Sequence, residues 1–186
     1  MTPRELLNIM ETAQLLKDAT RHCYTQSGKK ETVAEHSWLM SFMAMCLKDQ
    51  FPDVDMNKVM KMCIVHDLGE CFTGDIPVHL KTSADNAKEE ELLYAWVDTL
   101  PKPFGDELKA LYDEMAALET PEARIYKSLD KLEAIAQHNL SDLSTWEPHE
   151  YQLQKTYAID FVAFSDYLSQ LRGEILNDTL KKIGEA

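Results

Sequence analysis

Helix-start signals divide this sequence into segments, and apolar residues recur with helical spacing after each of them. Thr2-Pro3-Arg4-Glu5 and Thr32-Val33-Ala34-Glu35 are capping boxes, and Thr120-Pro121-Glu122 is a third start with proline at the first helical position. Leu (23) and Ala (16) far outnumber Val (7) and Ile (8), and the 6 Gly and 7 Pro leave few breaks. The pattern therefore predicts an all-α fold.

The apolar periodicity places the expected helices and loops. Asp18–Glu31 is polar and unusually basic, so we expect a loop there, and the glycines at 69 and 74 predict a second loop. One long helix is expected to carry Tyr157 to Leu171. The other helices are expected over about 3–17, 32–50, 55–66, 84–100, 106–118 and 120–136. The length of 186 residues predicts a single domain, 1–186.

The charge and the cysteines limit the classes of function. A formal net charge of −13 opposes binding to a nucleic-acid polymer. The longest stretch without a charged residue, His36 to Leu47, is too short to span a bilayer, and the start lacks a signal-peptide pattern. The four cysteines form no CxxC pair, which is typical of reduced thiols. We therefore expect a cytoplasmic protein that does not engage a membrane.

Ionisable residues interrupt the apolar faces of three expected helices. His66 continues the apolar face of its helix and is followed by Asp67, His36 lies about one turn into another helix, and Asp130 lies between two leucines. A carboxylate in such surroundings must be paired, hydrogen-bonded or bound to a metal. The residues alone leave two alternatives open: three separately satisfied polar groups in the core, or one metal site.

The order His36 … His66-Asp67 … Asp130 resembles the H…HD…D signature of the HD-domain metal-dependent phosphohydrolases. The segment from His66 to Asp75, HDxxExxxGD, looks closer still to the HD-type 5′-deoxynucleotidases and is the most specific part of the match. The resemblance implies an all-α HD-domain helical bundle with the metal site in its core. Its motif-bearing part covers about 6–140, and helices at about 150–183 are expected to pack on it.

The resemblance implies that His36, His66, Asp67 and Asp130 bind one divalent metal ion. Two neutral imidazoles and two carboxylates give a ligand charge of −2, and mixed nitrogen and oxygen ligands suit Mn, Fe, Co, Ni or Zn better than Mg. Such an ion would acidify a water molecule and polarise the phosphorus.

The resemblance also implies roles for residues beside the metal. It assigns catalysis to Glu70 and Asp75, one activating the water and one protonating the leaving oxygen, without saying which does which. It assigns phosphate binding to Arg21, the best-shaped member of a basic Lys17–Lys30 segment that would compensate the acidic average. Lys81 is a weaker second candidate.

The remaining histidines carry less definite expectations. His22 stands where some members of the family have a tryptophan near the sugar, which leaves selectivity between deoxyribose and ribose open. His79 adds potential metal-binding capacity, although a solvated role is the simpler interpretation. His138 and His149 have no partner pattern, so we interpret them as structural.

The resemblance therefore implies a phosphoric monoester hydrolase that converts (deoxy)nucleoside 5′-monophosphates to nucleoside and phosphate. One alternative is an HD phosphohydrolase acting on nucleoside triphosphates, cyclic nucleotides or alarmones, although longer phosphate chains should need more basic residues. A second alternative is a non-catalytic, metal-stabilised helical interaction protein, which would not need Glu70 and Asp75. Phe161, Phe164 and Tyr167 could form a homodimer interface or could belong to the core.

Overall fold

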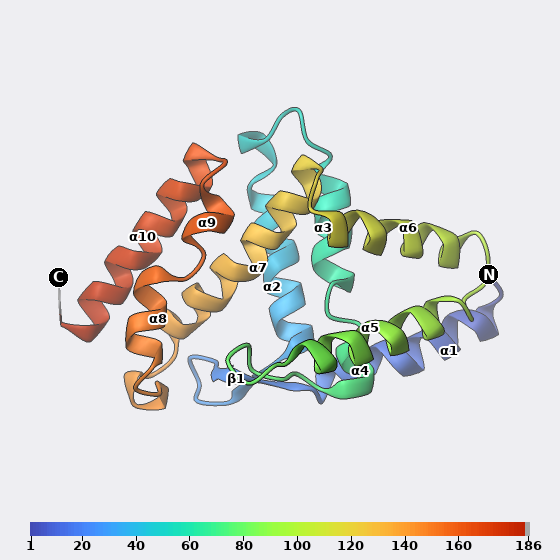
Figure 1. The fold of residues 1–186 in the computed structure, drawn as a ribbon, viewed down its shortest axis with the longest axis horizontal. Helices are drawn as coiled ribbons and strands as arrows, with labels where there is room; N and C mark the ends of the chain where they lie inside the picture. Colours follow the sequence, from blue (N-terminus) through green and yellow to red (C-terminus); the bar gives the residue numbers. More distant parts are fainter. Residues whose placement is uncertain (185–186) are drawn as a thin grey trace.

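Helices make up most of the fold in the computed structural model, which describes residues 1–184 (Figure 1). In chain order the elements are α1 (Pro3–Ala13), the 3-10 helix η1 (Gln14–Lys17), β1 (Thr20–Tyr24), β2 (Lys30–Thr32), α2 (Val33–Cys46), η2 (Lys48–Gln50), α3 (Met56–Val65), α4 (Glu70–Thr73), α5 (Ser83–Val97), α6 (Phe104–Ala117), α7 (Pro121–Leu140), η3 (Leu143–Thr145), α8 (Glu150–Thr156), α9 (Ile159–Val162) and α10 (Asp166–Ile183). The all-α prediction is confirmed, because the only sheet among the described residues is a two-stranded hairpin.

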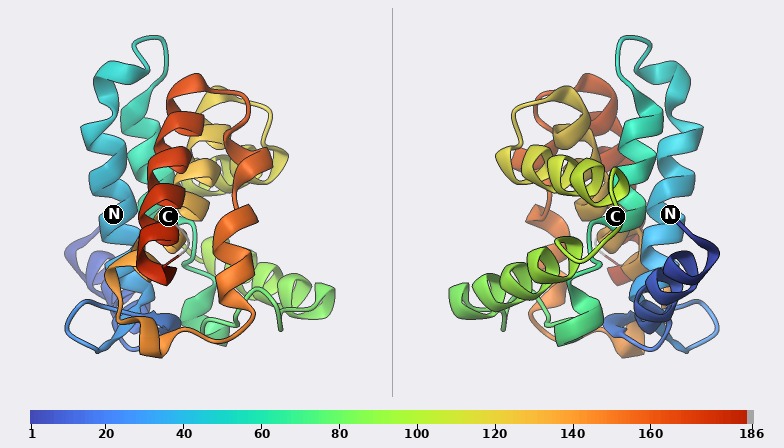
Figure 2. Two further views of the ribbon diagram at one scale, coloured as in Figure 1. Left: turned by 90° about the vertical axis from the view of Figure 1, so that its left-hand side faces the viewer. Right: turned by 90° about the vertical axis from the view of Figure 1, so that its right-hand side faces the viewer.

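The core forms where α2, α3 and α7 meet. α2 and α3 lie side by side, as the two views of Figure 2 show, and α7 crosses both of them. Met40, Val59, Leu129 and Leu132 are fully buried at this junction. The same three helices carry the predicted histidines and aspartates, so the core packing also fixes the site.

The predicted helix starts are confirmed at the residues that the caps indicated. Thr2 and Thr32 both form complete capping boxes, each accepting a backbone N–H from the glutamate three residues later. Asp55 caps α3, and Thr120 caps α7 by accepting from the N–H of Ala123.

The prediction of a loop over Asp18–Glu31 was wrong, because this segment contains most of a β-hairpin. β1 and β2 pair antiparallel, with Thr20 opposite Thr32 at the open end. The side-chain amide of Gln137 on α7 donates a hydrogen bond to the carbonyl of Tyr24 at 2.7 Å. The hairpin is therefore fixed by contacts with α7, about a hundred residues away in sequence, which its own polar sequence does not reveal.

The expectation of one long C-terminal helix was also wrong, because the chain divides into α8, α9 and α10. Ala158 adopts a left-handed conformation with φ 69°, and Ser165 caps a new helix by accepting from the N–H of Leu168. The buried guanidinium of Arg172 donates to the carbonyls of Gln154, Lys155 and Tyr157, which lie at the end of α8. α9 and α10 pack against α7, and α8 packs against α10, on the side of the molecule away from α5 and α6 (Figure 1).

The periphery is less deeply packed than the core. Every side chain of α1 is at least partly exposed, and α5 and α6 extend to the side away from α10 (Figure 1). Phe164 packs against the core, whereas Phe161 and Tyr167 are exposed, so the proposed homodimer surface stays a prediction. Within residues 1–184, no helix combines the length and apolar character needed to cross a membrane.

Candidate metal centre

Two histidines from different helices face each other in the core. His36 lies in the first turn of the capped helix α2, and His66 is the residue at which α3 ends. Their ring centroids are 5.2 Å apart. His36 Nδ1 hydrogen-bonds the buried carboxylate of Glu133, and His66 Nδ1 lies 2.9 Å from the carbonyl oxygen of Cys63. Since a carbonyl only accepts, His66 Nδ1 must donate there, which fixes the ring and leaves Nε2 for another partner.

Both free ring nitrogens point at carboxylates. Nε2 of His66 lies 3.0 Å from Oδ2 of Asp67, and Nε2 of His36 lies 3.6 Å from Oδ1 of Asp130. Both Nε2 atoms are buried, and among residues 1–184 neither has a hydrogen-bond partner of good geometry. Ligand atoms of His36, His66 and Asp67 all lie within 4.8 Å of one another. This donor set of two oriented imidazoles and two carboxylates fits a divalent transition metal ion.

The electrostatics of the cluster hold its aspartates ionised. Burial alone would raise the pKa of Asp67, but the neighbouring His66 outweighs it and holds that pKa below its usual range. The pKa of Asp130 is likewise lowered, despite burial, by Lys127 and Lys131, whose amines lie 2.9 and 3.1 Å from its Oδ2. Two ionised carboxylates are what a cation would need here.

A second layer of charged groups surrounds His36. Burial opposes a charge on His36, yet Glu133 and Asp130 outweigh it and raise the pKa of His36 to about 9. Glu31 is buried beside this pair and lies 3.1 Å from Nε of Arg21, while NH1 of Arg21 lies 3.9 Å from Asp67. The hairpin therefore connects Arg21 both to the cluster and to the carboxylates behind it.

Glu70 and Asp75 follow His66 and Asp67 in sequence and line the pocket that Asp67 and Asp130 also line. Burial, with smaller contributions from Asp67 and Asp75, raises the pKa of Glu70 to about 9, and its Oε2 has no hydrogen-bond partner within the described chain. Burial also raises the pKa of Asp75, although Arg21 opposes the rise. Both carboxyls are therefore poised to exchange protons closer to neutrality than ordinary carboxyls.

The pocket at the cluster has a volume of about 420 Å³, and its basic residues differ from the expectation. Of the Lys17–Lys30 segment, only the part from Arg21 to Cys23 lines it, so the lysines of that segment do not supply its positive charge. Lys127 and Lys131 of α7 do so instead. Lys81 also lines the pocket, but its amine is paired with Glu89 at 2.7 Å.

Some residues of the site carried no signal that identified them. Glu133 and Lys131 stood in the sequence beside Asp130, and Lys127 precedes it by three residues, so one helical turn places all of them near it. Glu31 directly precedes the helix start of α2, and only the hairpin brings it to Arg21. A lysine or glutamate on a helix is more often a solvated residue, which is why the sequence did not indicate them.

The fold and the site together define an all-α protein whose core holds a cluster of two histidines and two aspartates. The model of the HD domain matches residues 13–172, which is most of the chain, and the protein therefore belongs to the HD domain family.

Comparison with known proteins supports the same family. The chain is 32% identical over 143 residues to the 5′-deoxynucleotidase HDDC2 of Danio rerio, covering 74% of this chain and 70% of that protein. It is 30% identical over 138 residues to the human protein of the same name, with 72% and 67% covered. A solved structure from Magnetospirillum magnetotacticum, described as a metal-dependent phosphohydrolase, shares the fold with a TM-score of 0.78 at 23% identity, covering 96% of this chain and 95% of that one.

Proposed function

We propose that this protein is a metal-dependent 5′-nucleotidase that hydrolyses (deoxy)nucleoside 5′-monophosphates to nucleoside and phosphate. The observation that carries the proposal is the histidine–aspartate cluster at the wall of a pocket that also contains Arg21, Glu70 and Asp75. The relatives named 5′-deoxynucleotidase, at 30 to 32% identity, support the substrate class.

His36, His66, Asp67 and Asp130 would hold one divalent ion, with Mn, Fe, Co, Ni or Zn favoured over Mg by the two imidazoles. When bound, such an ion supplies Lewis acidity that polarises the phosphoryl group and lowers the pKa of water. The lowered pKa values of Asp67 and Asp130 favour ionised carboxylates, and an ion bound at Nε2 of His36 would displace the proton that the raised pKa of His36 favours there.

Arg21 would bind the phosphate of the substrate. Its guanidinium lies in the pocket wall, and the neighbouring carboxylates raise its pKa despite burial, so it stays charged. A planar guanidinium offers two parallel N–H groups to two phosphate oxygens. Lys127 and Lys131, which pair with Asp130, and Lys81, which pairs with Glu89, would add positive charge around the phosphate.

Glu70 and Asp75 would handle the two protons of the hydrolysis. One carboxylate accepts a proton from the attacking water, and the other carboxyl donates a proton to the 5′-oxygen as the bond between phosphorus and oxygen breaks. Both carboxyls have raised pKa values in this pocket, with that of Glu70 raised to about 9 in the protein alone. A positive ion beside Asp67 would bring the pKa of Glu70 back toward neutrality, where proton exchange is efficient.

The experiment that tests this function is a substrate panel. Phosphate release is measured for deoxy- and ribonucleoside mono- and triphosphates, each with several divalent metals. We expect release from monophosphates that depends on a transition metal and is lost in His66→Ala and Asp67→Ala, which should also lose the ion held by His36, His66, Asp67 and Asp130. Preference for triphosphates would replace this proposal with the triphosphate alternative, and no release from any substrate would favour the non-catalytic one.

We also infer that the protein is located in a reducing compartment, such as the cytoplasm. All four cysteines are free, and Cys23 and Cys63 are buried with burial raising the pKa of both thiols. Unpaired thiols of this kind persist where disulfides are kept reduced.

A further inference from the structure

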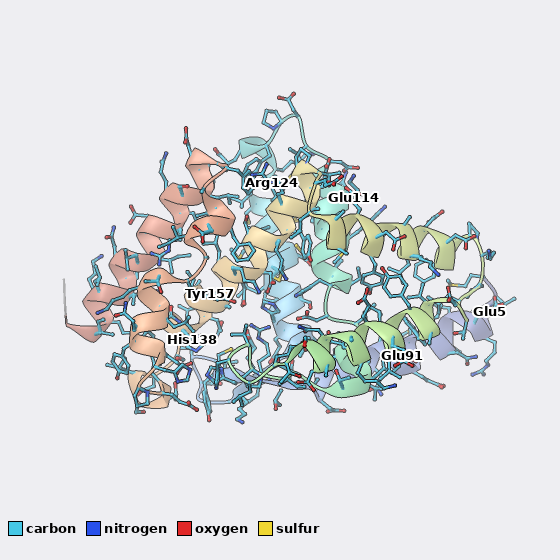
Figure 3. All side chains as sticks on the ribbon, viewed as in Figure 1. Glu5, Glu91, Glu114, Arg124, His138 and Tyr157 are labelled. Carbon is cyan, nitrogen blue, oxygen red and sulfur yellow. The ribbon has the colours of Figure 1, made fainter. Side chains whose placement is uncertain are left out.

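A second group of metal-ligating side chains lies on the wall of the same pocket. His22 comes from β1, His138 from the end of α7, and Glu150 from the start of α8. Oε1 of Glu150 lies 2.6 Å from Nε2 of His22 and 2.7 Å from Nε2 of His138. His138 is labelled beside α8 in Figure 3. None of these three residues belongs to the cluster of His36, His66, Asp67 and Asp130, so they form a separate candidate site.

The tautomer of His138 is fixed by the backbone. Its Nδ1 lies 2.9 Å from the carbonyl oxygen of Ala134, which can only accept, so Nδ1 must carry a hydrogen. Nε2 lies 2.7 Å from Glu150 Oε1, where it either donates a second ring hydrogen to the carboxylate or offers a lone pair to a cation that takes the place of that proton. Two lone pairs at this distance repel each other unless a proton or a cation lies between them. His66 shows the same orientation at the first cluster, with Nδ1 donating to a carbonyl and Nε2 facing a carboxylate.

His22 supplies a second unsatisfied nitrogen. Its Nε2 is buried and has no well-directed hydrogen bond in residues 1–184, although Glu150 Oε1 is close. The ligand atoms of His22, His138 and Glu150 all lie within 4.8 Å of one another. A buried imidazole without a partner is costly unless a ligand satisfies it.

Glu150 is held as an oriented carboxylate. Only 2% of the residue is exposed, and its Oε2 accepts the backbone N–H of Glu147 at 2.6 Å. One carboxylate oxygen is thus fixed by the backbone while the other faces both imidazoles.

We propose that His22, His138 and Glu150 bind a second divalent transition metal ion, of the zinc, nickel or cobalt class, in the pocket that Asp67 and Asp130 also line. Two imidazole nitrogens and one carboxylate oxygen are a ligand set that these ions favour. One carboxylate against a divalent ion leaves a net positive charge facing the pocket. The inference concerns metal binding alone and does not depend on the proposed function.

The test is a count of metal ions per chain in the full-length protein. The wild type and three variants are equilibrated at a fixed free Zn²⁺ concentration, and bound zinc is measured. We expect two ions in the wild type, one in Asp67→Ala, one in His138→Asn, and none in the double variant. The affinity of the second site should fall by more than about 100-fold in His138→Asn, because loss of a ligand costs at least as much as loss of a group that orients one.

Two further variants keep the count interpretable. His22→Gln changes the cluster from the hairpin side, outside the buried α7–α8 contact, and should also remove one ion while leaving the circular dichroism spectrum unchanged. His149→Asn is the matched control, because His149 belongs to the separate exposed group with His79 and Glu147. The control should keep both ions.

Cobalt provides a second readout that does not rely on activity. Co²⁺ added to Asp67→Ala should give visible absorption bands that disappear when His22→Gln is added to that variant. The proposal is overturned if Asp67→Ala binds no metal, if His22→Gln and His138→Asn each leave the count unchanged, or if His149→Asn alone removes the second ion.

Discussion

Among single residues, Glu133 illustrates how a side chain that is not itself a proposed metal ligand can position one. Its buried carboxylate hydrogen-bonds Nδ1 of His36 and so directs Nε2 toward Asp130. Both residues are fully buried, which leaves neither an alternative partner in water. The motif reveals the proposed ligands because they carry the pattern, whereas we infer that Glu133 would act only through the ring that it orients.

Glu133→Gln should weaken metal binding by about 10- to 100-fold, the usual effect of removing a group that orients a ligand. Glutamine keeps the size of the side chain but removes the charge that stabilises His36. The measurement is competition for the metal against a chelator. Glu11→Gln, on the exposed face of α1, is the control and should bind as the wild type does. Equal affinity in both variants would show that Glu133 does not position His36.

Arg21→Ala should lower kcat/KM for a deoxynucleoside monophosphate by about 10- to 150-fold, the effect of losing a charged hydrogen bond to the substrate. Arg21→Lys keeps the charge but loses the planar pair of donors, so it should recover only part of the loss. The measurement is kcat/KM for all three proteins. If Arg21→Ala equals the wild type on monophosphates, the phosphate is bound elsewhere.

Glu70→Ala and Asp75→Ala should bind metal normally and turn over about 10²- to 10⁴-fold more slowly on nucleotides. A nitrophenyl phosphate separates their roles, because its leaving group needs no proton. One of the two variants, the one that lacks the proton donor, should regain activity on this substrate, and the other should not. Rescue of both variants, or of neither, would contradict the assignment of one proton to each.

Single helices and strands show which parts of the fold the sequence predicted and which it did not. The capped starts of α2, α3 and α7 were predicted, because Thr32, Asp55 and Thr120 satisfy backbone N–H groups within a few residues. The hairpin was not predicted, since its strands are short and polar and depend on Gln137 of α7. The break at Ala158 was not predicted either, because the apolar pattern continues through it while the stabilising contact comes from Arg172. The sequence thus predicted the elements that nearby residues stabilise, and it missed those that depend on residues distant in the chain.

Gly74→Ala should destabilise the protein by about 1–3 kcal/mol, because Gly74 ends α4 with φ 72° and ψ 167°, a conformation that side chains other than glycine rarely adopt. The same strain should displace Asp75 and reduce turnover. Thermal and urea unfolding measure the stability. Gly173→Ala is the matched control, since Gly173 lies within α10 with no atom within 4 Å of an added Cβ. The control should instead stabilise by about 0.5–1 kcal/mol, and a similar effect of both changes would contradict the strain at Gly74.

The whole molecule builds its pocket from parts that are distant in sequence. The lining begins at Arg21 in the hairpin, continues through the loop after α4, and ends at Tyr157 beyond α8. The C-terminal helices therefore contribute to the pocket wall as well as packing on the motif-bearing part. We infer that the chain forms one domain, as its length suggested, although residues 185–186 lie outside the part that the structure describes.

One domain of this kind should unfold in a single transition. Far-ultraviolet and near-ultraviolet circular dichroism should give the same midpoint in urea, because helices and aromatic packing are lost together. Addition of Zn²⁺ at about 100 times its dissociation constant should raise the free energy of unfolding by about 2.7 kcal/mol per site. Two separate midpoints would show that the helices after about residue 150 form an independent unit.

The wide sequence separation of the cluster also has a consequence for the order of events during synthesis. The ribosome releases the hairpin, His36 and His66 well before α7, which carries both Asp130 and Glu133. A nascent chain that ends before α7 has histidines that nothing orients and a cluster without its last carboxylate. We therefore expect firm metal loading to wait until α7 has emerged, so that a chain interrupted earlier would remain without metal, which would separate finished molecules from incomplete ones.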